Sequence, residues 1–344
     1  MMVEKYLIKN YVDVLDNKNV RCKVCPHMCV IAERKAGICT TRINIDGKLY
    51  STVYGYPCGL HIDPIEKKPL YHFYPDQKIL SFGTYGCNLF CAGCQNYDIT
   101  RVNASKTILN PQLSVLEYYS PEDIVNAALE NSIKLIAYTY NEPTIFFEYM
   151  LDIAKNARKK GIKNVIVSNG YINQEPLKEL CKYIDAANID LKGITEAFYK
   201  EYSKTSLKPV LETIKTLHDN GIWLELTNLI IPGLNDSAKD IKKLCEWIKN
   251  NAGTTTPLHF SKFHPAFKAS NLSTSASKLE EAKKIASDVG LKYVYIGNLG
   301  YLDNTICTKC GSVLIERNYD SISMKGLTAK NRCAKCGTII VGVF

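Results

Sequence analysis

The stretch Gly86-Cys87-Asn88-Leu89-Phe90-Cys91-Ala92-Gly93-Cys94 directly follows a short apolar run at residues 79–83. Its cysteines have the spacing Cys-x3-Cys-x2-Cys, and the next cysteine along the chain is Cys181. Three thiolates on one loop can hold three irons of a cubane cluster and leave the fourth iron open to an external ligand. The alternative is a zinc loop that takes its fourth ligand from elsewhere in the chain. The position directly after a strand of a βα array favours the cluster.

From about residue 79 onward, short apolar runs alternate with amphipathic stretches, which is typical of βα units around a parallel sheet. This pattern predicts strands at residues 79–83, 133–139, 164–168, 187–191, 222–230, 258–263 and 292–296. It predicts helices at residues 121–131, 144–160, 174–184, 195–219, 236–250 and 277–289. Six βα units and a seventh strand make a partial barrel or a doubly wound sheet. In either fold, the ligand site lies at the C-terminal ends of the strands.

A cysteine-rich segment of irregular character precedes the array, with one hairpin predicted at residues 42–50 around the turn Asp46-Gly47. Four of its cysteines fall within 18 residues and have no evident apolar core of their own: Cys22, Cys25, Cys29 and Cys39. A bound metal that organises the segment is the simplest explanation. Zinc and an auxiliary iron–sulfur cluster both remain open for this site.

A second cysteine-rich segment follows the array. Two Cys-x2-Cys-Gly turns present Cys307, Cys310, Cys333 and Cys336, a pattern that matches tetrahedral coordination by four thiolates. Structural zinc is favoured, and a rubredoxin-like iron that relays electrons is the alternative, because the same thiolates hold either metal. We therefore predict an N-terminal extension at 1–78, a barrel at 79–301 and a four-cysteine module at 302–344.

Composition limits the function classes. The chain has 344 residues, 14 cysteines and a formal net charge of +9. It shows no signal-peptide pattern and no run of the ~18 apolar residues that a membrane helix needs, so we expect a cytoplasmic protein without a membrane partner. Cytosolic cysteines are rarely disulfides, and metal-bound thiolates would offset much of the positive charge. A nucleic-acid partner is therefore not expected.

At the three-cysteine loop the sequence resembles the radical S-adenosylmethionine (SAM) superfamily, over about residues 79 to 299. In that family, the amino and carboxylate groups of SAM chelate the open iron of a 4Fe-4S cluster. One electron then cleaves the sulfonium to methionine and a 5′-deoxyadenosyl radical, which abstracts hydrogen. The full length looks like the radical enzyme of the AmmeMemoRadiSam system, close to pyruvate formate-lyase activating-like proteins. The resemblance implies an α/β fold with a partial (β/α)6 barrel of the radical SAM type.

The resemblance also implies roles for residues at the strand ends. Glu142, in Tyr140-Asn141-Glu142-Pro143, is expected to meet the amino group of the methionine moiety. Asp190 and Lys192, within Asn188-Ile189-Asp190-Leu191-Lys192-Gly193, resemble the activating-enzyme branch, where such residues contact cofactor or substrate, and they are the expected catalytic pair. Taken alone, the same motif is equally a buried Asp–Lys ion pair.

Three further residues are candidates for binding SAM. Gly93 occupies a position that is often aromatic in the family and packs on adenine, so backbone contacts persist there while stacking is lost. Asn169 ends the third predicted strand, and His264 closes the sixth. His264 could equally be a structural histidine. The charged segment 63–73 either walls the active site or forms a solvated turn.

The function that we expect is that of an oxidoreductase of the activating-enzyme type, with a 4Fe-4S cluster and SAM as cofactors. Its partners would be a low-potential electron donor of the ferredoxin or flavodoxin type and an unidentified substrate. That substrate would be a glycine on a partner protein or a small molecule. One alternative is a zinc-ribbon protein that associates with nucleic acid and uses the barrel as a scaffold. The other, an electron-transfer protein, would need closed clusters only, and the three-cysteine loop argues against it.

Overall fold

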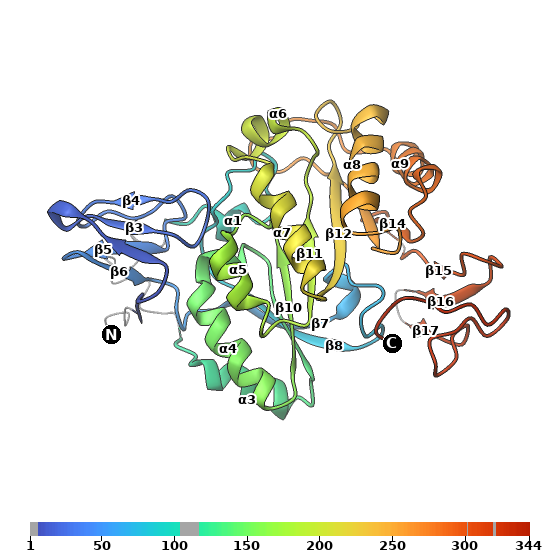
Figure 1. Cartoon of the computed structure of the whole chain (residues 1–344), viewed down its shortest axis with the longest axis horizontal. Helices are drawn as coiled ribbons and strands as arrows, with labels where there is room; N and C mark the ends of the chain where they lie inside the picture. The colour runs from blue at the N-terminus through green and yellow to red at the C-terminus, as the bar shows by residue number, and fades with distance from the viewer. Residues whose placement is uncertain (1–5, 104–116, 301, 319–320) are drawn as a thin grey trace.

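The fold was analysed in a computed structural model, which describes residues 6–103, 117–300, 302–318 and 321–344 (Figure 1). The largest sheet among these residues has eight strands in the order β14-β13-β12-β11-β10-β9-β8-β7. Their bounds are β7 Cys58–Pro64, β8 Lys78–Gly83, β9 Leu135–Tyr138, β10 Lys163–Ser168, β11 Ala186–Asp190, β12 Trp223–Ile230, β13 Leu258–Lys262 and β14 Val294–Gly297.

Strands β8 to β14 pair in parallel with their neighbours and correspond to the seven predicted strands. The predicted partial barrel is therefore confirmed, with the C-terminal ends of these strands at one edge. Strand β7 was not predicted, and it adds to β8 in the antiparallel sense. Its burial does not alternate regularly and its register with β8 shifts, so it carries little of the period-two pattern that identifies a strand.

Helices cover the sheet between successive strands (Figure 1). They are α3 Pro121–Glu130, α4 Phe147–Lys159, α5 Gln174–Leu180, α7 Lys208–Asp219, α8 Ala238–Asn251 and α9 Ala276–Val289. Ser120 is the N-cap of α3 and forms a capping box with Asp123. None of the described helices is long and apolar enough to cross a membrane.

The prediction of a single helix at 195–219 is wrong. The segment contains α6 Glu196–Phe198, a π-helical turn η5 Tyr199–Ser203, and α7, which begins at Lys208. The break falls at Lys204, whose φ of 58° is left-handed, and Pro209 lies in the first turn of α7. A left-handed residue ends a helix, and a proline suits the start of the next one, so the apolar periodicity concealed two separate helices.

The N-terminal segment is more regular than the sequence predicted. Among the described residues it forms one three-stranded sheet from β1 Tyr6–Leu7, β6 Lys48–Ser51 and β5 Arg42–Ile45. A second sheet contains β2 Val12–Val14, β3 Val20–Cys22 and β4 Val30–Ile31. The β5–β6 hairpin is the predicted one, with Asp46 and Gly47 at positive φ in its turn.

The C-terminal residues form a small module at the opposite end of the molecule from the N-terminal sheets (Figure 1). Its strands are β15 Thr305–Ile306, β16 Val313–Arg317 and β17 Ile322–Ser323. The buried Arg317 attaches it to the barrel, because its Nη2 donates to the Tyr71 carbonyl at 2.7 Å and its guanidinium lies 4.2 Å from the centre of the Tyr71 ring.

A buried carboxylate inside the barrel fixes the segment that leads into β8. Glu225 on β12 accepts hydrogen bonds from the backbone amides of Tyr71 and His72 at 2.9 and 2.8 Å, and from His259 Nε2 at 2.7 Å. Burial would raise the pKa of Glu225, but His259 lowers it, so the side chain stays ionised. The segment before β8 is thereby anchored within the barrel, which places its lysines at the opening.

Candidate active site at the strand ends

The three-cysteine loop leaves β8 at the C-terminal edge of the sheet. Asn141, just beyond β9, holds the start of this loop: its Oδ1 accepts from the Thr84 amide at 3.1 Å, and its Nδ2 donates to the Gly86 carbonyl at 3.0 Å. Asn141 stands next to Glu142 in the segment at residues 140–143, but no local pattern marks it as a functional residue. Its amide group bonds both an N–H and a carbonyl of the loop, and so fixes the direction in which the loop leaves the strand.

The loop opens on a cavity of about 330 Å³, a size that suits a small-molecule cofactor. All three loop cysteines line it: Cys87, Cys91 and Cys94. Of the residues predicted from the sequence to bind the cofactor, four also line it: Gly93, Asn169, Asp190 and Lys192. Residues that are far apart in the sequence therefore meet at one place, as expected for the C-terminal ends of parallel strands.

The spacing of the three sulfurs indicates which metal group they suit. Zinc–sulfur bonds of about 2.3 Å allow two thiolates on one ion to be at most about 4.6 Å apart. Among the described residues, the three sulfurs do not form a group in which all ligand atoms lie within 4.8 Å of one another. A cubane holds each thiolate on a different iron, so a wider triad fits a 4Fe-4S cluster and does not fit a single ion.

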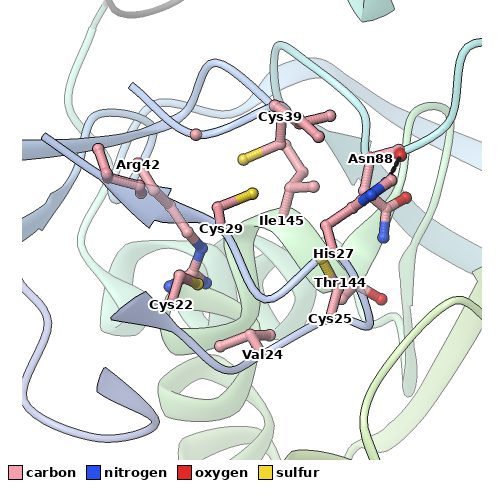
Figure 2. A pocket seen from close by; sticks show the side chains of 13 residues that line it. Cys22, Val24, Cys25, His27, Cys29, Cys39, Arg42, Asn88, Thr144 and Ile145 are labelled. Carbon is pink, nitrogen blue, oxygen red and sulfur yellow. Dashed lines mark hydrogen bonds between the residues drawn. The ribbon is translucent and has the colours of Figure 1, made fainter. Parts of the chain in front are cut away.

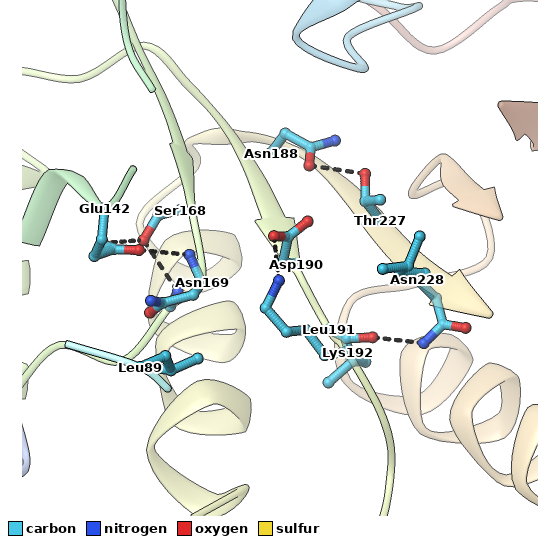
Figure 3. Close-up of polar contacts among 12 residues, drawn as sticks. Leu89, Glu142, Ser168, Asn169, Asn188, Asp190, Leu191, Lys192, Thr227 and Asn228 are labelled. Carbon is cyan, nitrogen blue, oxygen red and sulfur yellow. Dashed lines mark hydrogen bonds and ion pairs between the residues drawn. The ribbon is translucent and has the colours of Figure 1, made fainter. Parts of the chain in front are cut away.

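Asp190 and Lys192 form an ion pair at the cavity wall, which was the alternative interpretation of the motif, with 2.6 Å between Lys192 Nζ and Asp190 Oδ2 (Figure 3). Burial would lower the pKa of Lys192, but Asp190 and the Cys91 thiolate raise it well above its usual value. Burial also raises the pKa of Cys91, and Lys192 opposes that change. The lysine is thus a fixed cation beside Cys91 and can attract an anionic group into the cavity.

Glu142 lies behind the cavity wall and is not one of the lining residues. Its carboxylate accepts from Thr144 N and Oγ1. It also accepts from Ser168 Oγ at 2.7 Å and from the Asn169 backbone N–H at 2.8 Å (Figure 3). Burial raises the pKa of Glu142 above its usual value, and the hydrogen bonds from these donors offset part of that increase. In this arrangement Glu142 orients Ser168 and Asn169, which do line the cavity, so its direct contact with the cofactor stays a prediction.

His264 follows β13 on an exposed stretch, and it is not among the residues that line the cavity. The structure therefore does not bring it together with Asp190, Lys192 and the loop cysteines. Its predicted bond to the cofactor stays a prediction.

Gly93 is closely covered by two aromatic side chains. A Cβ atom at this position would lie 2.7 Å from Phe263 Cε2 and 2.9 Å from Tyr202 Oη, closer than real contacts allow. The Gly93 amide donates to the Tyr202 hydroxyl. Tyr202 itself lines the cavity and stacks on Phe198, with ring centres 5.1 Å apart. An aromatic side chain from η5 thus lies against position 93 at the cavity, which no local sequence pattern could reveal.

The charged segment before β8 forms a wall of the cavity, which answers the question that the sequence left open. Lys67 and Lys68 both line it. Lys68 Nζ bonds Asp63 Oδ2 at 2.7 Å, and the Tyr140 hydroxyl donates to the same oxygen at 2.6 Å. Burial would raise the pKa of Asp63, but these hydrogen bonds lower it to about 2.

We expect the substitution Asp63→Asn to lower the free energy of unfolding by about 3 kcal/mol at pH 7, because it leaves the buried Lys68 ammonium without its partner. The folded pKa lies below the unfolded one, so this stabilisation should be present above pH ~4 and lost as pH falls towards 2. Urea unfolding curves measure it. Asp46→Asn, which breaks the exposed pair with Lys18, is the matched control and should change nothing measurable. An equal effect of both substitutions would contradict the prediction.

The C-terminal cysteines form a compact site of a different kind. Cys307, Cys310, Cys333 and Cys336 place all four sulfurs within 4.8 Å of one another. The sulfurs of Cys307 and Cys336 are 3.6 Å apart, and those of Cys310 and Cys333 are 3.7 Å apart, close to the ~3.8 Å edge of a tetrahedron with 2.3 Å bonds. The Ser312 hydroxyl helps to lower the pKa of Cys333 to about 6. The predicted four-thiolate site is therefore assembled and could hold one ion.

Comparison with known proteins agrees with this arrangement. The profile of the Radical SAM superfamily matches residues 82–248, which contain the three-cysteine loop and the strand ends described above. The uncharacterized protein MJ0808 of Methanocaldococcus jannaschii is 44% identical over 331 residues, covering 95% of this chain and 96% of that protein. The chain belongs to the radical SAM superfamily.

Two further relatives relate this radical SAM protein to the activating-enzyme branch. A pyruvate formate-lyase-activating enzyme of Clostridium pasteurianum is 25% identical, covering 48% of this chain and 67% of that protein. A 4-hydroxyphenylacetate decarboxylase activating enzyme of Clostridium scatologenes is 27% identical, covering 51% of this chain and 55% of that protein. These matches span about half of the radical SAM chain.

Proposed function

We propose that this protein is a radical SAM oxidoreductase of the activating-enzyme type. One observation carries the proposal: Cys87, Cys91 and Cys94 share a cavity with Asp190 and Lys192 at the C-terminal ends of the barrel strands. When bound there, a 4Fe-4S cluster and SAM would supply a 5′-deoxyadenosyl radical that abstracts hydrogen from the substrate. The three thiolates fit such a cluster because their spacing is wider than one ion permits.

The side chains around the cavity would bind and orient SAM. Lys192 is a cation at the wall and suits a carboxylate, while Asp190 fixes the position of the ammonium group. Glu142 acts through Ser168 and Asn169, because it holds both from behind. Removing its carboxylate would leave buried donors unpaired and would disturb the wall that the cofactor meets.

Tyr202 would supply the aromatic surface for adenine that Gly93 does not provide. We expect Tyr202→Ala to raise the Kd for SAM by about 5- to 150-fold, the range that corresponds to the 1–3 kcal/mol of base stacking. Tyr202→Phe keeps the ring and should stay within about threefold of the wild type. Equilibrium binding of SAM to the anaerobically reconstituted protein measures both. Equal losses in the two variants would instead assign the effect to the hydroxyl bond with Gly93.

The names of the relatives suggest a class of substrate and of electron donor for this protein. Because two of them are named as activating enzymes, we propose a glycine residue of a partner protein as the site of hydrogen abstraction. A donor of the ferredoxin or flavodoxin type would supply the electron that cleaves SAM. An oxygen-sensitive cluster and many free thiols suit the cytoplasm of a cell that lives with little oxygen.

The test of the proposed function is direct. The protein, reconstituted anaerobically with iron and sulfide, is mixed with dithionite and SAM, and 5′-deoxyadenosine is measured by chromatography. We expect its formation to require both dithionite and the reconstituted cluster. If none forms while the cluster is present and SAM is bound, the protein is not a radical SAM oxidoreductase. Salt-dependent binding of nucleic acid together with that result would favour the zinc-ribbon alternative.

A further inference from the structure

The four N-terminal cysteines surround a common cavity between the N-terminal sheets and the barrel (Figure 2). Cys22 ends β3, Cys25 and Cys29 lie in the loop to β4, and Cys39 lies before β5. Apolar side chains such as Ile145 also line it, together with the polar side chains of Arg42, Asn88 and Thr144. Cys22 and Cys39 are 5% and 8% exposed, so the fold brings these sulfurs out of solvent at one place.

The spacing of these sulfurs does not suit a single ion. Two thiolates on one zinc lie at most about 4.6 Å apart. Among the described residues, the four C-terminal cysteines are the one group of three or more Cys, His, Asp or Glu residues whose ligand atoms all lie within 4.8 Å of one another. No three of the N-terminal sulfurs meet that limit. The same chain therefore contains one compact tetrad and one wide tetrad, and the wide one resembles the Cys87 triad.

The surroundings of the wide tetrad suit an iron–sulfur cluster. Backbone amides hydrogen-bond to three of its sulfurs: that of Val24 to Cys22, that of His27 to Cys25, and that of Ile38 to Cys29. Amide hydrogen bonds to sulfur and an apolar shell are the means by which proteins hold and tune such clusters. Among the described lining residues, Arg42 is the permanent cation, and it is already paired with Glu148 at 3.0 and 2.7 Å.

His27 connects this cavity to the active site. Its Nε2 donates to the carbonyl of Asn88 at 2.7 Å, so that nitrogen is not available to a metal. Asn88 follows Cys87 directly in the sequence and lines the N-terminal cavity. Its side chain accepts from Asn169 Nδ2 at 2.9 Å. Asn88 therefore lies between the wide tetrad and the three-cysteine site.

We propose that Cys22, Cys25, Cys29 and Cys39 bind a second 4Fe-4S cluster next to the three-cysteine site. Four thiolates occupy all four irons, so this cluster has no open iron for SAM. It would hold the N-terminal sheets in place. The proposal rests on the geometry and the surroundings of the tetrad, and it stands whether or not the protein cleaves SAM.

The experiment counts acid-labile sulfide, which single-ion sites do not contain. We expect about eight sulfides and eight irons per chain in the reconstituted wild type, and about four of each in the triple variant Cys87→Ala/Cys91→Ala/Cys94→Ala. Mössbauer spectra of the triple variant should show a cubane. Zinc at the compact C-terminal site should remain at about one per chain in both proteins.

Two further variants complete the design. Cys25→Ser/Cys29→Ser should retain about four sulfides, from the three-cysteine site, and Cys181→Ser, whose cysteine lies at the end of α5, should retain all eight. The triple variant decides the question even if the Cys25/Cys29 variant does not fold. A triple variant without sulfide, whether it contains a second zinc or one isolated iron, would overturn the proposal.

Discussion

Replacing Cys91 with alanine should lower the rate of 5′-deoxyadenosine formation by about 1,000-fold or more. Cys91 is one of three thiolates on a loop that supplies no fourth cysteine, so the variant leaves two irons without a protein ligand instead of one. It also removes the thiolate that faces Lys192, and so disturbs the charge balance of the wall where SAM would bind. The measurement is single-turnover product formation with dithionite under anaerobic conditions.

Cys245→Ala provides the control for this substitution, because Cys245 is fully buried on α8 and lies outside the three cysteine groups. It should reduce stability through a small cavity while leaving product formation per cluster unchanged. Product formation at the wild-type rate in Cys91→Ala would refute the assignment of the loop. If Cys91→Ala binds SAM as the wild type does and has an unchanged cluster spectrum, the assignment is refuted as well.

Replacing Cys333 with serine should remove about one metal ion per chain and unfold the C-terminal module. The four sulfurs of this compact site lie within 4.8 Å of one another, and the module offers only short strands to hold its turns together. In such small modules, much of the folding free energy comes from binding the metal. Metal analysis and limited proteolysis measure the two effects.

The active site should survive this change. The C-terminal module lies at one end of the molecule (Figure 1), and its four cysteines do not line the cavity at the three-cysteine loop. We therefore expect the Cys333→Ser variant to form 5′-deoxyadenosine at close to the wild-type rate. A proportional loss of metal and product would mean that this site takes part in electron delivery, as the rubredoxin-like alternative requires.

Much of the fold could be predicted from local patterns. The seven parallel strands appear as short apolar runs because both faces of such a sheet are buried. Helix α3 begins at a local signal, a serine followed by a proline in the first turn. The two features of the fold that were not predicted, strand β7 and the break in the helix predicted at 195–219, lack such local patterns. Strand β7 is a half-exposed edge without alternation, and the break at Lys204 is a single backbone conformation inside an apolar period.

The sequence by itself determined which residues can bind metal, because thiolate groups such as Cys87-x3-Cys91-x2-Cys94 are short-range patterns of ligand type and spacing. Only the tertiary structure decided which group is compact enough for one ion: among the described residues, the four C-terminal sulfurs lie within 4.8 Å of one another, and the sulfurs of the other two groups do not. It also placed Tyr202 beside Gly93 and Lys68 at the cavity wall. These contacts join segments far apart in the chain, so they depend on how the barrel closes and leave no trace in local periodicity.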